Sequence, residues 1–445
     1  MRRSSGLRSP YDAEIARIAL PALGALAADP LVSLIDTAFV GRLGVDALAS
    51  LGVAVAVFGI AFALASFLPY GATPLIAAAT GSGETARQGR LGRGTLVLAV
   101  GSGLVAFAAL ELAVHPVGRL MGASGVVLGG SVTYLRIRAA SLPAVFIILG
   151  SHGIFRGHQD TRTPLVVSIA VSLMNLVLDP ILIFGFGLDL AGAAWATVAA
   201  QWAGALVFVY LLLGPFKKRL GIDAGHGLEL RRLFRAGSAL ILRTVSLLAA
   251  LSVATAIAAR IGTVAVAAHQ VTFQIWLFLA LVVDALAVAA QARVGAYVGS
   301  GDVEAARRVG DRLVFLGIMT GVGLALVLGA GAGVIPGWFS DDARVVAAVG
   351  SVYPFVVLSQ PLNAVVFVWD GVGIGAAGFR YLASSMVAAG LVSVAALGSV
   401  LPLDLGLSGV WWALVALMVV RAVALAWWYR AGPLGLHRGR ASRAA

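Results

Sequence analysis

Long apolar runs recur along this chain from end to end, and they limit what it can fold into. We place them near residues 15–40, 47–79, 94–114, 124–151, 164–187, 190–213, 233–259, 264–297, 313–335, 346–370, 381–401 and 408–429. Each is near or above the roughly 20 residues that a helix needs to cross a bilayer. Only 12% of the 445 residues are charged, against roughly 25% in soluble domains. The sequence therefore predicts an all-α integral membrane protein with twelve transmembrane helices.

Basic residues are distributed unevenly between the two sides of these predicted spans. With the N-terminus placed in the cytoplasm, the outer side holds only Arg42, Arg119, Arg260 and Arg344, whereas the inner side holds 22 basic residues. Because cytoplasmic loops carry an excess of Lys and Arg, we expect both termini in the cytoplasm. The same rule explains the net charge of +12 without nucleic acid as a partner. The chain has no cysteine, which excludes disulfides and thiolate metal sites.

The second half of the chain repeats the first at a shift of 218 residues, where Gly-Ser-Gly-Glu at 81–84 recurs as Gly-Ser-Gly-Asp at 299–302. The same shift, or one residue less, pairs Pro143 with Pro361, Gly153 with Gly371, Gly157 with Gly375, Arg162 with Arg380 and Trp195 with Trp412. Six spans separate equivalent residues, so both halves start on the same side of the membrane. We predict two six-helix bundles, related as parallel repeats, with a central cleft. The predicted parts are an N-terminal lobe at 1–216, a cytoplasmic linker at 217–235 and a C-terminal lobe at 236–445.

One predicted span contains a carboxylate in the middle of its apolar run. Asp179 lies four residues after Asn175, so both occupy one helical face. Placing an acid at this depth costs about 2.5–3.5 kcal/mol on insertion scales. Pro180 has no N–H to donate to the carbonyl of Leu176, which leaves a backbone acceptor near the acid. This stripe indicates a cation or proton site, although a polar patch that holds helices together is the alternative.

The first span contains two acids, Asp29 and Asp36, which share a helical face about 10 Å apart along the axis. Pro21 and Pro30 allow this helix to bend. Asp36 is the candidate for ion coupling. We expect Asp29 to be structural, either as a cap for the segment at Pro30 or as the partner of an arginine.

Other charged residues fall inside predicted spans of the second half. These are Arg243, Asp284, Asp370 and Arg421. Such charges usually pair across helices, and an Arg243–Asp284 pair is one possibility. A free histidine titrates in the physiological range, but we expect His152 and His269 to be satisfied histidines of the core or of an interface.

The two Gly-Ser-Gly-acid loops have a structural interpretation. Glycine allows a tight exit from the preceding helix, and the acid can cap the next one. Neither loop has the lysine of a phosphate-binding motif.

Several motifs, taken together and in order, resemble those of multidrug and toxic compound extrusion (MATE) antiporters. They are Asp36-Thr-Ala-Phe-Val-Gly-Arg-Leu-Gly44, Arg156-Gly-His-Gln-Asp-Thr-Arg-Thr-Pro164, Asn175-x-x-x-Asp179-Pro180 and Gly192-Ala-Ala-Trp-Ala-Thr197. The segment from Gln360-Pro-Leu-Asn363 to Asp370-Gly371 is similar to the DinF branch of that family. The chain departs from the family at Gly-His-Gln-Asp (157–160), where relatives usually keep a shorter polar turn, and it lacks the glutamate that the sodium-coupled branch carries in span 7.

The resemblance implies two six-helix lobes and outward export driven by a proton or sodium gradient. It places ion coupling at Asp36, Asp179, Asn175 and Thr197, and substrate binding at Tyr134, Asn175 and Asp36. The missing span 7 glutamate makes a sodium site in the C-terminal lobe doubtful.

We therefore predict an exporter that works by alternating access and exchanges amphipathic cationic compounds for protons or sodium. An acidic wall favours lipophilic cations, and burial disfavours the charged form of its carboxyl groups. We expect a monomer in the plasma membrane whose partners are a small-molecule substrate and lipids. We expect no cofactor beyond the coupling ion, no metal site and no enzymatic activity.

Three other protein classes fit the sequence less well. A flippase for lipid-linked precursors is the closest, but its cargo favours a cationic cavity and the N-terminal lobe here is acidic. An intramembrane prenyltransferase needs paired Asp motifs on inner loops, which the sequence lacks. A major facilitator has an Asp-Arg pair after its second span, where this chain reads Glu84-Thr-Ala-Arg87.

Overall fold

The computed structural model describes residues 9–339 and 342–431, without the side chain of Asp29, and they are almost entirely helical. The helices are α1 (Asp12–Gly41), α2 (Val45–Ala65), α3 (Phe67–Gly81), α4 (Thr85–Leu120), α5 (Gly125–Ala139), α6 (Leu142–Gly157), α7 (Arg162–Pro180), the π-helix η1 (Ile181–Gly185), α8 (Asp189–Leu213), α9 (Leu230–Ile261), α10 (Thr263–Gly299), α11 (Val303–Ala330), the 3-10 helix η2 (Ile335–Trp338), α12 (Ala343–Gly375), α13 (Phe379–Val400) and α14 (Gly406–Ala431). The arginines near both termini, which were counted for the orientation, lie outside the described residues. The Asp29 side chain also lies outside them, so its predicted role stays a prediction.

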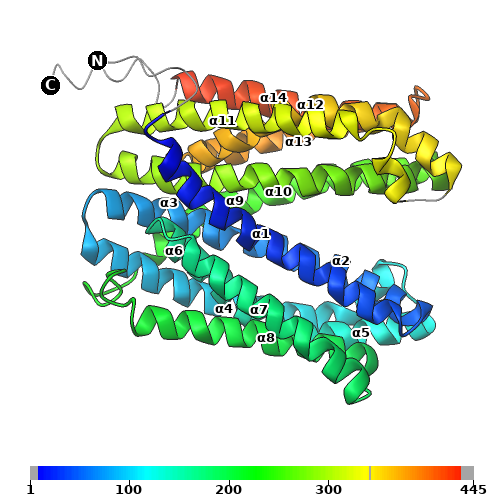
Figure 1. Ribbon diagram of the computed structural model, residues 1–445, viewed down its shortest axis with the longest axis horizontal. Coiled ribbons are helices and arrows are strands. Elements are labelled where there is room, and N and C mark those ends of the chain that lie inside the picture. The colour runs from blue at the N-terminus through cyan, green and yellow to red at the C-terminus, as the bar shows by residue number, and fades with distance from the viewer. Residues whose placement is uncertain (1–8, 340–341, 432–445) are drawn as a thin grey trace. The chain divides into compact units, whose positions relative to one another are not determined.

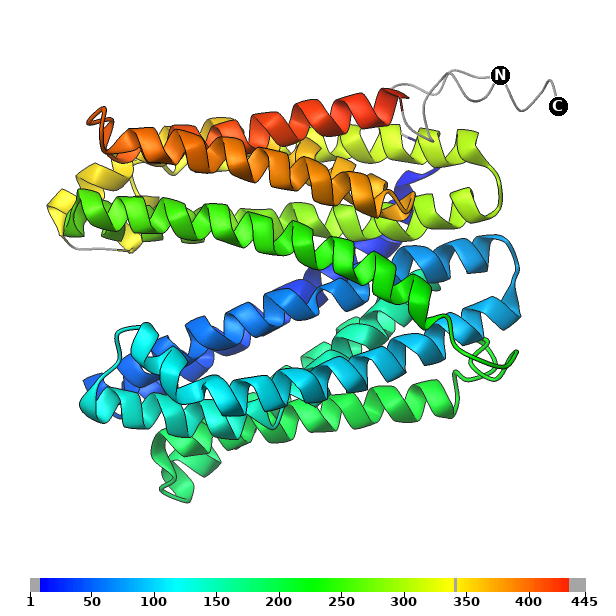
Figure 2. The same cartoon turned by 180° about the vertical axis from the view of Figure 1, so that it is seen from behind.

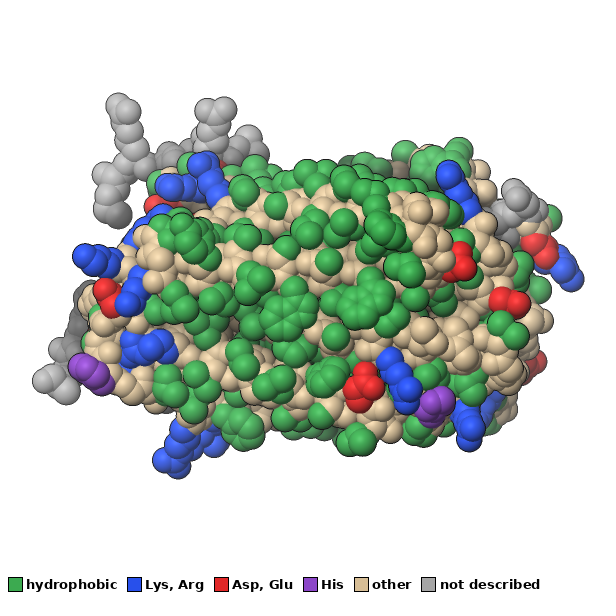
Figure 3. Space-filling view, turned by 90° about the horizontal axis from the view of Figure 1, so that it is seen from below, with side chains coloured by type: hydrophobic (Ala, Val, Ile, Leu, Met, Phe, Trp, Pro, Cys, Tyr) green, Lys and Arg blue, Asp and Glu red, His purple; other side chains and the backbone are tan. Residues whose placement is uncertain are grey.

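The predicted all-helical membrane fold is confirmed. Among the described residues, eleven spans are long and apolar enough to cross a membrane, and the pair α5–α6, bent by 50°, brings the number to twelve. The run predicted at 47–79 consists of α2 and α3, which meet at Ser66, where the hydroxyl donates to the carbonyl of Ala63 at 2.6 Å. One face of the molecule has hydrophobic side chains over its middle and charged ones mainly toward its ends (Figure 3), as expected for a protein that crosses a bilayer.

The helices form two compact units. One unit holds Leu20–Gly237, and the other holds Ser238 onward together with the first turns of α1 up to Ala19. In the second unit α10, α11, α12 and α14 run side by side (Figures 1 and 2). We call the two units the N-terminal and C-terminal lobes. Their limits differ from the predicted ones at the start of α1 and in the segment that joins the lobes.

The start of α1 is anchored to the C-terminal lobe by two ion pairs. Asp12 accepts two hydrogen bonds from Arg312 of α11, at 2.6 and 2.7 Å, and Glu14 pairs with Arg293 of α10. Ile15 and Ile18 are buried in the same hydrophobic cluster as helices α10 to α12. These contacts explain why the first turns of α1 belong with residues that are distant in the sequence.

The linker was predicted at 217–235, and its residues before α9 pack against α4 of the N-terminal lobe. Arg93 of α4 donates to the backbone carbonyls of Ile222, Ala224, Gly225 and Gly227. Two more arginines of α4, at positions 87 and 90, form ion pairs with Glu229. The segment is therefore held by α4 along much of its length.

This arrangement predicts that Arg93→Met releases the segment from α4. In the cysteine-free chain, Ile222→Cys is buried in the parent structure, at 2% exposure, and should react slowly with a water-soluble maleimide. Adding Arg93→Met should raise that rate by about tenfold or more, because the carbonyls lose a charged donor. Asp223→Cys, which is already exposed, is the matched control and should react equally fast in both backgrounds. An unchanged rate at position 222 would contradict the contact.

The predicted repeat is visible in the packing of equivalent residues. A Cβ added at Gly103 of α4 would lie 2.7 Å from Cα of Pro143 in α6, and a Cβ at Gly321 of α11 would lie 2.8 Å from Cα of Pro361 in α12. The two glycine–proline pairs occupy equivalent positions in the two halves of the chain. Each lobe therefore uses a glycine to bring one helix against the proline of another.

We predict that Gly103→Val and Gly321→Val each destabilise the protein by about 1–3 kcal/mol, because the new side chain is forced against backbone. The matched controls are Gly101→Val and Gly323→Val on the same two helices, where an added Cβ has no atom within 4 Å among the described residues. Thermal unfolding in detergent should show a lower midpoint for the first two variants only. Equal midpoints for all four would refute the close helix contact.

The two Gly-Ser-Gly-acid loops have similar backbone conformations, but their acids make different hydrogen bonds. Gly83 and Gly301 have φ values of 73° and 79°, a conformation that favours glycine. Asp302 caps α11 by accepting from the N–H of Ala305 at 2.8 Å, as predicted. Glu84 makes no such cap and instead accepts from Ser82 at 2.8 Å, which lowers the pKa of its carboxyl group.

Candidate functional site

The helix that carries Asp179 changes its winding directly after the acid. α7 ends at Pro180, and the chain continues as the π-helix η1. Proline lacks the N–H that an α-helix requires, and short π segments occur often at functional sites. A Cβ at Gly192 of α8 would lie 2.7 Å from the carbonyl of Leu182 in η1. Glycine therefore lets α8 approach η1 closely.

Asn175, Asp179 and Thr197 form one buried polar cluster between α7 and α8. The Asn175 amide donates to the Asp179 carboxylate at 3.4 Å and to the Thr197 hydroxyl at 3.3 Å. Thr197 in turn donates to the carbonyl of Ala193 at 2.9 Å. All three side chains are at most 5% exposed. Asn175 thus fixes the orientation of the Asp179 carboxylate.

Asp36 of α1 joins this cluster. Its carboxyl group is buried and lies within hydrogen-bonding reach of Asp179, so that one carboxyl can donate to the other when it carries a proton. One further oxygen of each acid, Oδ1 of Asp36 and Oδ2 of Asp179, is buried without a hydrogen-bond partner among the described residues. The predicted coupling residues Asp36, Asp179, Asn175 and Thr197 therefore lie together.

Tyr134 and Arg138 of α5 border the two acids. The Tyr134 side chain is 3% exposed, and its hydroxyl interacts with the Arg138 guanidinium and with the charges of both carboxylates. Arg138 also lies over the Phe58 ring, 4.1 Å from its centroid. The sequence pointed to Tyr134 by resemblance, but Arg138 was not among the predicted site residues. Its place four residues after Tyr134, on the same helical face, is the signal that could have identified it.

The chemistry of this acid cluster follows from its charges. Two carboxyl groups in contact cannot both ionise without strong repulsion, so the pair favours one shared proton or a bound cation. The single guanidinium nearby offsets only one negative charge. No group of three or more His, Asp or Glu side chains suited to a metal ion occurs among the described residues.

Three of the four charged residues noted inside predicted spans of the second half form a separate cluster. Asp370 of α12 pairs with Arg243 of α9 and, at 3.3 Å, with Arg421 of α14. Arg421 is 2% exposed and also donates to the sulfur of Met418 at 3.3 Å. The sequence suggested Asp284 as the partner of Arg243, and that pairing stays a prediction. The Asp370 carboxylate thus links α9 and α14 to α12.

The comparison with known families decides the identity of the chain. Residues 21–181 and residues 240–400 each match the MatE family model. The chain belongs to the MatE family. The two matches also support the internal repeat, because one family unit occurs in each half. The chain is therefore a MATE efflux transporter, and the resemblance inferred from its motifs is confirmed.

Proteins with similar sequences agree with the assignment to this family. The chain is 37% identical to "Protein DETOXIFICATION 44, chloroplastic" of Arabidopsis thaliana over 435 residues, which cover 93% of this chain and 81% of the relative. It is 30% identical to "DNA damage-inducible protein F" of Escherichia coli over 302 residues, which cover 65% of this chain and 64% of the relative. The second match supports the similarity to the DinF branch.

Solved structures confirm the fold. A MOP superfamily transporter from Pyrococcus furiosus aligns with a TM-score of 0.84 at 23% identity and covers 96% of this chain and 98% of its own. A mutant of the Vibrio cholerae MATE transporter VcmN aligns with a TM-score of 0.84 at 21% identity and covers 95% of this chain and 98% of its own.

Proposed function

We propose that this MATE transporter exports amphipathic, cationic small molecules in exchange for protons, and that coupling takes place at the acid cluster of the N-terminal lobe. The contact between the Asp36 and Asp179 carboxyl groups carries the proposal. Repulsion between them is relieved when a proton is shared or when a cation approaches, and these two events exclude each other. Competition for one site is what an exchanger requires.

The cycle follows from this competition. When both acids are ionised, their charge and the buried surroundings favour a lipophilic cation. A proton arriving from the outer side neutralises the pair, weakens cation binding and releases the substrate. The transporter then returns in its protonated form and gives the proton up inside. The substrate and the proton each shift the protein toward the conformation that binds them more strongly.

A proton suits the cluster better than sodium does. Cations such as sodium need several oxygen ligands arranged around the ion, whereas the carboxyl groups of Asp36 and Asp179 are close enough to share a hydrogen bond. Asn175 supports the pair by donating its N–H to Asp179. In the C-terminal lobe the buried Asp370 is paired with two arginines, which neutralise its charge.

We further propose that the transporter works as a monomer in the plasma membrane, with both termini in the cytoplasm. The orientation rests on the excess of basic residues on one side of the spans. Two of its Arabidopsis thaliana relatives are named as chloroplastic proteins, so members of the family differ in the membrane in which they reside.

Proton release on substrate binding tests the proposal. Ethidium added to purified protein in weakly buffered detergent solution should release about one proton per bound cation, because the pair in contact holds one proton that the cation replaces. Asp36→Asn should bind ethidium more weakly and release no proton. Ethidium binding without proton release, together with displacement of ethidium by sodium, would contradict proton coupling.

A further inference from the structure

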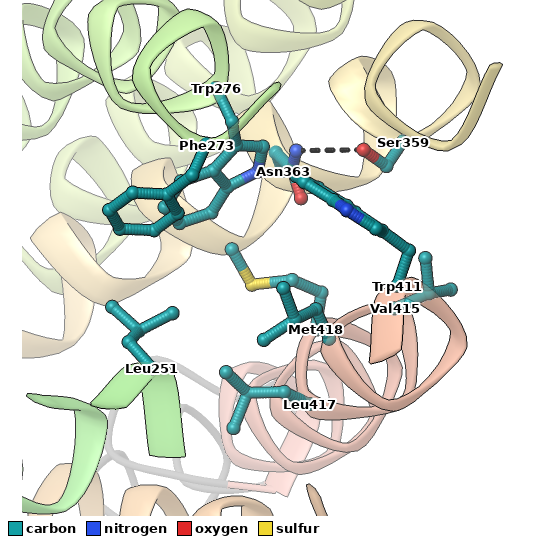
Figure 4. A pocket seen from close by; sticks show the side chains of 10 residues that line it. Leu251, Phe273, Trp276, Ser359, Asn363, Trp411, Val415, Leu417 and Met418 are labelled. Atoms are coloured by element: carbon teal, nitrogen blue, oxygen red, sulfur yellow. Dashed lines mark hydrogen bonds between the residues drawn. The ribbon is translucent and has the colours of Figure 1, made fainter. Parts of the chain in front are cut away.

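Two enclosed pockets of the protein are small, whereas one open groove is large. In the C-terminal lobe, a pocket between Phe273, Trp276 and Asn363 has a volume of about 20 Å³ (Figure 4), and a pocket beside His152 of the N-terminal lobe has about 30 Å³. Each has room for little more than one water. A groove on the N-terminal lobe has a volume of about 540 Å³, which lies within the range of about 300–1,000 Å³ that is usual for ligand sites.

This groove, the α4–α9 groove, lies between one face of α4 and the first turns of α9. Val97, Gly101 and Val105, four residues apart on one helical face, form the α4 wall, and Arg231 and Phe234 form the α9 wall. Val97, Val105 and Phe234 are 50%, 69% and 67% exposed. A Cβ added at Gly101 would have no atom within 4 Å among the described residues, so the glycine keeps the groove open.

The groove runs from the edge of the apolar run of α4 into that run. The first turn of α9 packs on Gly94, where an added Cβ would lie 3.0 Å from Cδ1 of Leu233 and 3.6 Å from the backbone N of Glu229. Gly94 begins the apolar run, and the arginines of α4 that hold the segment 214–229 precede it. Val105 lies eleven residues further, about 16 Å along the helix axis. The first turn of α9 therefore lies at the level of the lipid head groups, and the apolar walls lie at the level of the acyl chains.

Arg231 distinguishes this groove from the apolar helix faces that lipid covers on every membrane protein. Its side chain makes no hydrogen bond or ion pair within the described part of the chain. Glu229, the nearest acid in the sequence, is already shared by Arg87 and Arg90. The guanidinium charge of Arg231 is thus available to an anionic group, and its planar fork matches the oxygens of a phosphate.

We propose that the α4–α9 groove binds an anionic phospholipid of the cytoplasmic leaflet. The lipid phosphate accepts hydrogen bonds from the Arg231 guanidinium, and one acyl chain lies along Gly101, between Val105 and Phe234. Basic pockets between spans on the cytoplasmic side favour such lipids. A lipophilic cation, the proposed substrate class, is repelled by the same arginine. The choice of leaflet rests on the proposed orientation, whereas the site itself depends neither on the orientation nor on the coupling ion.

Native mass spectrometry of the delipidated full-length protein tests the charge at this site. The protein is titrated separately with palmitoyl-oleoyl phosphatidylglycerol and with the matching phosphatidylcholine, which differ only in the head group. The first phosphatidylglycerol should bind at least about fivefold more tightly, the factor that one basic residue at a membrane surface contributes. In Arg231→Gln this ratio should fall to about one, and Arg231→Lys should keep most of it.

Two controls separate a defined site from general surface charge. Arg232→Gln removes the same charge from the next residue, which is exposed and does not line the groove, and it should keep the ratio of the parent. Equal affinities for the two lipids in the parent, a ratio that survives Arg231→Gln, or an equal loss in Arg232→Gln would each overturn the proposal.

A third variant tests the acyl-chain part of the groove. Gly101→Met introduces the residue that the second half of the chain has at the equivalent position, Met319. It should lower the affinity for phosphatidylglycerol to about that for phosphatidylcholine, because the side chain fills the groove while Arg231 remains. Gly323→Met, at an open position of α11, is the matched control and should bind as the parent does. Unchanged phosphatidylglycerol binding by Gly101→Met would also overturn the proposal.

Discussion

Asp36→Asn and Asp179→Asn should each abolish gradient-driven export of a lipophilic cation while the protein is still inserted and folded. Asparagine keeps the shape and the hydrogen bonding of the side chain but cannot exchange a proton. We expect a loss of roughly 10²-fold or more in the export rate, as for other positioned proton-transfer groups. Insertion should survive, because a neutral amide is cheaper at membrane depth than a carboxylate.

Ethidium efflux from cells that express equal amounts of each variant measures this effect. Asp46→Asn is the matched control, because Asp46 is an exposed carboxylate of the same lobe, and its efflux should equal that of the parent. Normal efflux by either Asp36→Asn or Asp179→Asn at normal expression would remove the acid cluster from the coupling mechanism.

Asp370→Asn should produce the opposite pattern, a large loss of stability. The carboxylate of Asp370 holds Arg243 and Arg421, and Arg421 is almost fully buried. Removing the shared acid leaves a guanidinium buried beside a neutral amide, which costs about 3–5 kcal/mol. The thermal midpoint in detergent should fall clearly.

Two further variants identify the cause of that loss. Adding Arg421→Met to Asp370→Asn should restore part of the midpoint, because the buried positive charge is removed together with its partner. Glu304→Gln breaks an exposed ion pair with Arg308 and should leave the midpoint unchanged, since exposed pairs contribute little. If Asp370→Asn has the same thermal midpoint as the parent, the ion-pair cluster around Asp370 does not stabilise the protein.

Much of the fold follows from the sequence because membrane spans leave strong signals. The length of the apolar runs and the Pro, Gly and Trp matches between halves were enough to predict twelve spans and a repeat. Asp36 and Asp179 stood out for the same reason, since a carboxylate inside an apolar run is costly and therefore informative. Thr197 and Tyr134 came from the family resemblance, because a hydroxyl in a helix is common for other reasons.

What the sequence did not predict depends on contacts between distant residues. Arg138 lies at the end of α5, next to the bend between α5 and α6, and an arginine in an apolar run is usually interpreted as one that reaches the membrane surface. The segment 214–229 is polar and rich in glycine, so its docking on Arg93 leaves no periodic pattern. Asp12 resembles an ordinary acid in a first helical turn until the structure shows Arg312 beside it.

Exchange in proteoliposomes tests proton coupling at the acid cluster most directly. Purified parent protein is reconstituted with ethidium, and a proton gradient or a sodium gradient is imposed separately across the membrane. We predict that the proton gradient alone drives ethidium movement in the parent protein, and that neither gradient drives it in Asp36→Asn or Asp179→Asn. Movement driven by sodium alone, or by the proton gradient in either variant, would contradict proton coupling at this cluster.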